Sequence, residues 1–197
     1  MIINNKILFL HIPHTGGRFV SNNINKNQNC IHYNFKVIFK EIDIDHLNAF
    51  QNSCFLGSSR MFETFTIVRN PIDRFIGCLR NVNKLNLKAI KYMFENETNF
   101  FNTVNQLRES GTSNWFEPQI NFTEYDTKIW RFEDGVEEEF RKWMMNTFNL
   151  ELEKPTKDDL EMFKKKIYYN NVFDLNEEQK QYIKNYYFMD YKIFNYK

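Results

Sequence analysis

The feature that most constrains the fold is a short apolar run that leads directly into a glycine turn. Ile7–Leu10 is apolar throughout, and Pro13 and the pair Gly16-Gly17 follow it. A continuous run of this length is typical of a strand buried on both faces of a parallel sheet. The next residues have the spacing of one helix face: Phe19, Val20, Asn23 and Ile24. The sequence therefore predicts a strand, a tight loop and a helix over residues 7–24.

The same order of apolar run, turn and helix recurs at two later places in the chain. Phe65–Val68 is followed by Asn70, a good helix N-cap, and by Pro71, which suits the first helical position. Lys128–Phe132 is the third run, with Asp134 as the expected cap of the next helix. That helix would carry five apolar residues on one face: Val136, Phe140, Trp143, Met144 and Phe148.

Strands that alternate with helices are typical of an α/β protein. We expect a P-loop-like α/β fold in which a central, mainly parallel sheet is flanked by helices. A last helix should begin at Asn176, where Gln179 completes a capping box. No repeat or linker is visible, so residues 1–197 are expected to form a single domain. Ligands bind such sheets at the carboxyl ends of the strands, which points to the first two turns.

Charge and cysteine content argue against several classes of partner. The 26 basic and 25 acidic residues give a net charge of +1, which does not favour a nucleic-acid-binding protein. The three cysteines are an odd number without a CxxC pair, so neither a disulfide framework nor a metal site is expected. The N-terminus has no signal-peptide pattern, and its apolar run is too short to span a bilayer. We therefore expect a cytoplasmic protein with no membrane association.

The first turn, His14–Arg18, has the features of a phosphate cradle. Two glycines allow unusual dihedral angles and close approach of the backbone to a ligand. The N–H groups at the start of the following helix would then face an anion. An ATPase P-loop also needs a Lys-Ser or Lys-Thr pair after the last glycine, and this turn lacks it. The alternative is a tight glycine turn that holds no ligand.

The second turn places Arg69 at the end of a strand and beside the start of a helix. An arginine and a helix N-terminus together make a second candidate anion site. The alternative is that Arg69 and Arg74 only pair with Asp73 or with other acidic side chains.

Taken together, the two turns resemble the motifs of the PAPS-dependent sulfotransferases, in particular the carbohydrate enzymes related to those that modify heparan sulfate. The first motif of that family reads like H-I-P-K-T-G-G-T-S, and His11–Phe19 matches it here. The second reads like V-R-N-P-x-D-R-x-x-S, and Val68–Gly77 matches it. Weaker similarities extend through residues 116–119, 130–134 and 187–194, so the resemblance covers nearly the whole chain.

The resemblance implies PAPS as the cofactor, PAP as the product and no metal. It implies that Arg69 binds the 3′-phosphate that distinguishes PAPS from ordinary nucleotides. It also implies that backbone N–H groups of the first turn hold the 5′-phosphosulfate. The cofactor-binding residues of that turn are then His14, Thr15, Gly16, Gly17, Arg18 and Phe19.

The chain departs from the family pattern at three positions. His14 stands where the family has a catalytic lysine, which stabilises charge on the leaving oxygen. A protonated histidine can do the same, but an ordinary histidine, with a pKa of about 6.5, is only partly charged at neutral pH. Gly77 replaces a serine that contacts the 3′-phosphate, and Arg18 replaces a small hydroxyl residue.

The resemblance implies a catalytic base between the two motifs. His46, 23 residues before Arg69, is the first candidate and His32 the second. His11 is expected to have a structural role. Three side chains are expected to line the acceptor site, although Trp115 is as well explained as a core residue: Asn114, Trp115 and Gln119.

The expected function is transfer of a sulfuryl group from PAPS to an acceptor hydroxyl by in-line displacement with a histidine base. A carbohydrate is the expected acceptor, although a small molecule is also open, and the sequence predicts neither its identity nor the oligomeric state. Two alternatives stay open. One is a non-catalytic relative that binds PAP, another nucleotide or a glycan, and the other is a P-loop kinase-like enzyme.

Overall fold

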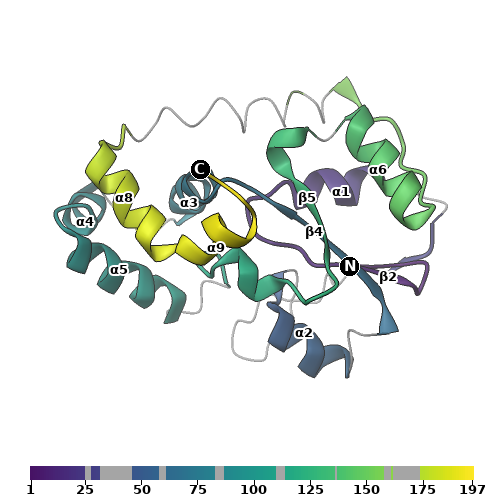
Figure 1. Cartoon of the computed structure of the whole chain (residues 1–197), viewed down its shortest axis with the longest axis horizontal. Coiled ribbons are helices and arrows are strands. Elements are labelled where there is room, and N and C mark those ends of the chain that lie inside the picture. The colour runs from purple at the N-terminus through teal and green to yellow at the C-terminus, as the bar shows by residue number, and fades with distance from the viewer. Residues whose placement is uncertain are drawn as a thin grey trace.

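The computed structural model describes residues 1–24, 28–31, 46–57, 61–82, 87–109, 114–135, 137–157, 161 and 174–197. Within these residues, five strands form one sheet in the order β3-β1-β2-β4-β5 (Figure 1). Their bounds are Ile2–Ile3 for β1, Ile7–Phe9 for β2, Cys30–Ile31 for β3, Glu63–Val68 for β4 and Lys128–Arg131 for β5.

The sheet is mixed. Strand β4 pairs in parallel with both β2 and β5, and these are the three strands that the sequence predicts. Strand β1 pairs antiparallel with β2 and β3 at one edge, an addition that the sequence analysis does not predict. A turn in which Asn4 and Asn5 have φ values of 52° and 57° joins β1 to β2, and asparagine tolerates this left-handed conformation. The chain is thus an α/β protein with a mixed sheet flanked by helices.

Helices α1 (Gly17–Asn23) and α6 (Glu138–Phe148) cover one face of the sheet (Figure 1). Alternate strand residues supply the sheet side of this contact, including Phe9, Phe65 and Ile67, and all three are buried. Phe19 from α1 and Phe140 from α6 pack with them in the same cluster. Apart from Val136, which lies outside the described residues, the helical stripes predicted after the first and third runs therefore contribute to the core.

The opposite face of the sheet packs against α2 (Ala49–Leu56), the short 3₁₀ helix η3 (Gln119–Phe122) and the C-terminal residues. Leu8 and Leu10 form one small cluster there. Val68 and Ile12 form another, with Phe122, Phe194 and Tyr196. The C-terminus thus packs beside the carboxyl end of β4.

A helical group lies beyond the carboxyl end of β4 (Figure 1). Its members are α3 (Pro71–Asn81), α4 (Leu87–Met93), α5 (Glu97–Glu109) and α8 (Glu177–Tyr186), with α9 (Phe188–Ile193) continuing from α8. They enclose an aromatic core around Phe75, Phe100 and Tyr187.

The predicted caps of two helices are confirmed. Asn70 accepts a hydrogen bond from the N–H of Ile72 at the start of α3, and Asn176 and Gln179 form a capping box at the start of α8. The predicted start of α6 is wrong, because Phe132–Asp134 form a separate 3₁₀ turn, η4, and α6 begins at Glu138. Gly135, with φ 86°, ends that turn before a helix can continue from Asp134.

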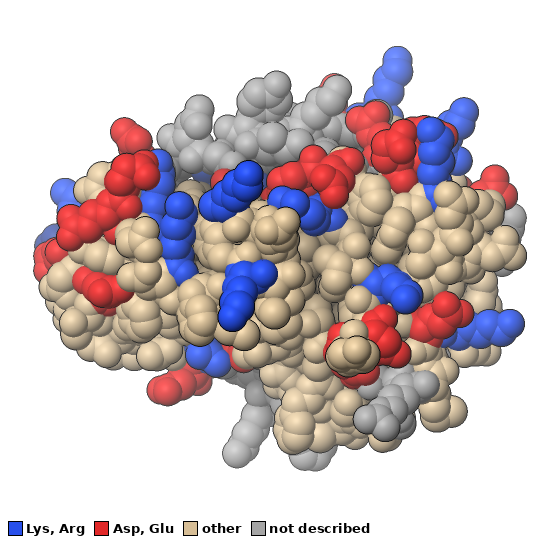
Figure 2. Space-filling view, viewed as in Figure 1, with Lys and Arg blue, Asp and Glu red and all other residues tan. Residues whose placement is uncertain are grey.

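On the face seen in Figure 2, basic and acidic side chains are interspersed rather than separated. This distribution agrees with the small net charge of +1. Among the described residues, no helix has the length and apolar character needed to cross a bilayer.

Candidate functional site

The two predicted anion-binding turns lie side by side, because they follow neighbouring parallel strands. The N–H of Leu10 donates to the carbonyl of Phe65 at 2.9 Å, so the pairing with β4 continues past the last residue of β2. Beyond that point the Nη1 of Arg69 donates to the carbonyl of His14 at 3.3 Å. The sheet therefore brings together two motifs that are 55 residues apart in the chain.

Two residues of the first turn have a left-handed backbone, His14 with φ 66° and Gly16 with φ 101°. A Cβ atom at Gly16 would come within 3.1 Å of the Phe132 ring. Beside it, the buried hydroxyl of Thr15 donates to the carbonyl of Ile12 at 2.8 Å. The sequence prediction of an unusual backbone is thus confirmed at Gly16.

Gly17 leaves space for a side chain of the protein rather than for the ligand that the sequence analysis predicts. A Cβ atom at Gly17 would lie 1.9 Å from the Nε2 of His11. The imidazole of His11 therefore makes the close approach to this glycine. The sequence analysis predicts a ligand there and does not foresee the histidine.

The far end of the predicted cradle is part of the core. The N–H of Phe19 donates to the carbonyl of Gly16 at 2.8 Å, and the Phe19 ring packs 6.4 Å from that of Phe140. The sequence analysis assigns the N–H of Phe19 to the phosphosulfate, but this N–H already forms the first backbone hydrogen bond of α1. Arg18 lies in α1 between these residues, and its side chain is outside the described part of the structure.

Arg69 lies at the junction of the two turns with only 5% of its surface exposed. Its guanidinium stacks over the Phe132 ring, 4.6 Å from the centroid, so Phe132 contacts both Arg69 and Gly16. Burial lowers the pKa of Arg69, while the carboxylates of Asp73 and Glu133 act in the opposite direction. An arginine keeps its charge in such surroundings. The site therefore contains a desolvated positive charge.

Arg74 is a structural residue that the sequence analysis does not identify as such. It is 1% exposed, its Nε donates to the carbonyl of Pro13 at 3.1 Å, and its Nη2 donates to that of Trp115 at 2.8 Å. Arg74 shares the buried stripe of α3 with Phe75 and Cys78, where an apolar side chain is usual. An arginine within this otherwise apolar stripe is the sequence signal that could have indicated a buried, structural role.

His46 and His11, from distant parts of the sequence, have adjacent rings. Their centroids are 4.5 Å apart with an interplanar angle of 48°. His14 lies elsewhere in the site, with its ring 5.3 Å from that of Trp115 in an edge-on contact. Gly77 also adjoins His14, since a Cβ there would be 3.4 Å from the His14 Nδ1. His32, the second candidate base, lies outside the described residues.

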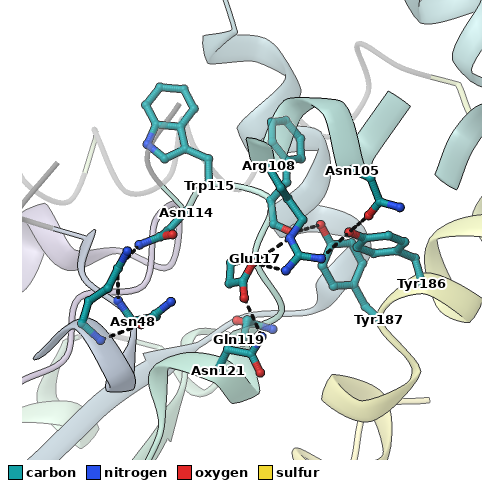
Figure 3. A network of polar contacts seen from close by, with 12 residues as sticks. Asn48, Asn105, Arg108, Asn114, Trp115, Glu117, Gln119, Asn121, Tyr186 and Tyr187 are labelled. Carbon is teal, nitrogen blue, oxygen red and sulfur yellow. Dashed lines mark hydrogen bonds and ion pairs between the residues drawn. The ribbon is translucent and has the colours of Figure 1, made fainter. Parts of the chain in front are cut away.

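Two of the predicted acceptor residues contact these histidines. The Nδ2 of Asn114 donates to the carbonyl of His46 at 2.8 Å and to Gln51 Oε1 at 2.6 Å. Figure 3 shows Asn114 and Trp115 side by side on one loop. Trp115 contacts His14 through its ring and Arg74 through its carbonyl. Asn114 and Trp115 therefore lie at the candidate site.

Gln119, the third predicted acceptor residue, is fully buried and bound to the backbone. Its Oε1 accepts from the N–H of Arg69 at 2.9 Å, and its Nε2 donates to the Arg69 carbonyl at 2.8 Å. The carboxylate of Asp190 accepts from the N–H groups of Gln119 and Ile120, each at 2.9 Å. These contacts give Gln119 a structural role, because they connect α9, η3 and the end of β4.

The described residues contain no group of three or more His, Cys, Asp or Glu side chains that could hold a metal ion. Comparison of the chain with protein-family models, with curated proteins and with solved structures finds no match.

Proposed function

We propose that this chain is a PAPS-dependent sulfotransferase that acts on an acceptor hydroxyl, with a carbohydrate as the acceptor. The observation that carries the proposal is the contact between Arg69 and the His14 carbonyl, at 3.3 Å. It joins a glycine turn and a buried arginine at the carboxyl ends of neighbouring parallel strands, where ligands bind such sheets. In a nucleotide with anionic groups at its 5′ and 3′ positions, one anionic group would bind at each of the two turns.

The residues of the first turn fit the 5′ end of such a ligand. His14 and Gly16 give the loop its left-handed backbone. The N–H groups of Thr15–Arg18 would hold the phosphosulfate, since they precede or open α1. Arg69 would pair with the 3′-phosphate through its planar guanidinium.

PAPS supplies a sulfur atom whose bond to a phosphate oxygen breaks as a new bond to the acceptor oxygen forms. The chain's own residues handle the protons and charges. His46 would take the proton of the acceptor hydroxyl, which leaves a positive imidazolium. His14 in its protonated form would neutralise the charge that remains on the departing PAP.

The proposal is tested by transfer of radiolabelled sulfate from PAPS to a panel of glycans and small hydroxyl compounds. The wild type should transfer sulfate to at least one acceptor, and His14→Lys should raise the rate above pH 7, because lysine keeps its charge there. His46→Gln should lower the rate by about 10²-fold or more, the usual contribution of a positioned base. Absence of transfer to every acceptor, together with no binding of PAP, would refute the proposal.

A second candidate is a non-catalytic relative that binds PAP or a glycan. The packing of His14 against Trp115 and Gly77 favours it, since a ring held on two sides in this way also suits a purely structural residue. Binding of PAP without transfer at any pH from about 5 to 8, and no gain from His14→Lys, would identify this case.

A further inference from the structure

Gln119 stands out among the described buried side chains because the oxygen and the nitrogen of its amide bind the backbone of one residue. Its Oε1 accepts from the N–H of Arg69 at 2.9 Å, and its Nε2 donates to the Arg69 carbonyl at 2.8 Å. A backbone N–H can only donate and a carbonyl can only accept, so these two bonds also define the orientation of the amide. The side chain of Gln119 therefore binds Arg69 much as the backbone of a neighbouring strand would.

The amide of Gln119 lies on the side of β4 where β2 has ended. The carbonyl of Phe65 in β4 accepts from the N–H of Leu10 at 2.9 Å and so faces the β2 side. Alternate residues of a strand bond to the same side, so Arg69, four residues later, presents its N–H and carbonyl there too. Strand β2 ends at Phe9, and at Arg69 the two bonds on this side come from Gln119.

Gln119 is itself held by the carboxylate of Asp190 on α9. The two oxygens of Asp190 accept from the N–H groups of Gln119 and Ile120, each at 2.9 Å. Gln119 and Asp190 are both fully buried, so water does not replace these bonds in the folded protein. The support of the Arg69 backbone is thus part of the core.

We propose that Gln119 is a positioning residue for Arg69, an inference that rests on the binding of PAPS and PAP proposed above. The two bonds hold the peptide groups on both sides of the Arg69 Cα, and with them the direction in which the side chain leaves the backbone. From there the guanidinium reaches the His14 carbonyl at 3.3 Å and lies over the Phe132 ring, 4.6 Å from its centroid. A guanidinium pairs with a phosphate through a fixed fork of N–H groups, and a binding site of this kind tolerates little displacement. Gln119 thereby favours a 3′-phosphorylated nucleotide without a contact to it.

Calorimetry with PAP and 5′-AMP tests this role in Gln119→Met, which keeps the length of the side chain and removes both bonds to Arg69. The variant should bind PAP roughly 5–30-fold more weakly than the wild type, part of the ~10–100-fold that the charge-assisted contact of Arg69 contributes. Its affinity for 5′-AMP should stay within about twofold of the wild type, because this nucleotide has no 3′-phosphate.

Thr66→Val is the matched control for the loss of a buried hydrogen bond in β4. The Thr66 hydroxyl donates to the carbonyl of Leu10 at 2.6 Å, and Thr66 is fully buried. This variant should lose stability but keep both nucleotide affinities. Asp190→Asn serves if Gln119→Met does not fold, because it disturbs only the support of Gln119, and it should weaken PAP binding while 5′-AMP binding is retained.

A double-mutant cycle with Arg69→Gln separates positioning from a general effect on the fold. In the Arg69→Gln background, Gln119→Met should change the affinity for PAP by less than about twofold, since the side chain that Gln119 positions is absent. Three results would overturn the role of Gln119 while PAP binding by the wild type leaves the proposed function standing: unchanged PAP affinity in Gln119→Met, equal losses for PAP and 5′-AMP, or a loss that persists in full in Arg69→Gln. A wild type that binds no PAP would overturn the proposed function itself, and the role of Gln119 with it.

Discussion

The two adjacent glycines of the first turn show how one dipeptide can meet two different requirements. Gly16 adopts a φ of 101°, which L-residues with a side chain rarely adopt, and it lies against Phe132. Gly17 has no such strain, but it leaves the space that the His11 ring fills. The first requirement concerns the backbone of the turn, and the second concerns the placement of a histidine beside His46.

Arg74 is the residue whose replacement should affect stability most clearly. Arg74→Met would leave the buried carbonyl of Pro13 without its donor and that of Trp115 with only the weak thiol donor of Cys78, at a cost of about 3 kcal/mol in the free energy of unfolding. Arg108→Met is the control, since Arg108 forms a partly exposed ion pair with Glu117, and its loss should cost below about 1 kcal/mol. Urea denaturation of both variants measures the difference. Equal losses would contradict the structural role of Arg74.

Cys78 and Cys54 should differ sharply in reactivity. Burial raises the pKa of the Cys78 thiol to about 11, and this thiol donates to the carbonyl of Trp115 at 3.0 Å. Cys54 is exposed on α2. Since the thiolate is the reactive form, a thiol reagent at pH 8 should label Cys54 in the folded protein and label Cys78 only after denaturation. Mass spectrometry after limited labelling measures the labelled fraction of each cysteine. Equal labelling of the two cysteines under native conditions would show that α3 is not packed as described.

At the scale of elements, the sequence predicts what depends on local patterns. The apolar runs predict β2, β4 and β5, and the caps at Asn70 and Asn176 predict where α3 and α8 begin. It does not predict β1 and β3, because two-residue strands carry no usable periodicity. It places the start of α6 too early, since Gly135 ends a separate turn first.

The candidate site also has features that the sequence pattern predicts and features that it does not. That the turns at Gly16 and Arg69 lie together is predictable from strand order, since ligand sites gather at the carboxyl ends of parallel strands. The contact between His11 and His46 depends on tertiary packing, and so does the pairing of Gln119 with Arg69. These contacts join residues far apart in the chain, and no local pattern encodes them.

The contact of α9 with η3 predicts a pH dependence. Burial raises the pKa of Asp190 above its ordinary value, so the folded state holds this proton more readily than the unfolded state. The contribution of Asp190 to stability is therefore greatest at low pH and is lost as the pH rises through the raised pKa. Relative to Asp190→Asn, the wild type should gain stability when the pH falls from about 7 to about 4. Urea denaturation of both proteins over this pH range measures the change in the free energy of unfolding. A wild type that loses stability as the pH falls would mean that the two N–H partners stabilise the Asp190 carboxylate more than burial destabilises it.

At the scale of the molecule, the sheet serves to gather distant segments. The turn around Gly16, the end of β4, the loop of Asn114 and Trp115, and α9 are far apart in the sequence. Bonds from Arg69, Arg74 and Gln119 connect the first three at the carboxyl ends of β2 and β4, and the carboxylate of Asp190 connects α9 to the N–H of Gln119. The three side chains are buried, so the connections are built into the core of the fold.

The central claim is that a 3′-phosphorylated nucleotide binds across the two turns, and calorimetry with PAP and 5′-AMP tests it most directly. The wild type should bind PAP more tightly than 5′-AMP. Arg69→Gln should lower the affinity for PAP by about 10–100-fold, the contribution of a charge-assisted hydrogen bond, and should leave the affinity for 5′-AMP unchanged. Arg141→Gln, on α6 beside Glu138, is the matched control and should retain both affinities. Equal affinity of the wild type for the two nucleotides, or no binding of PAP, would contradict the account.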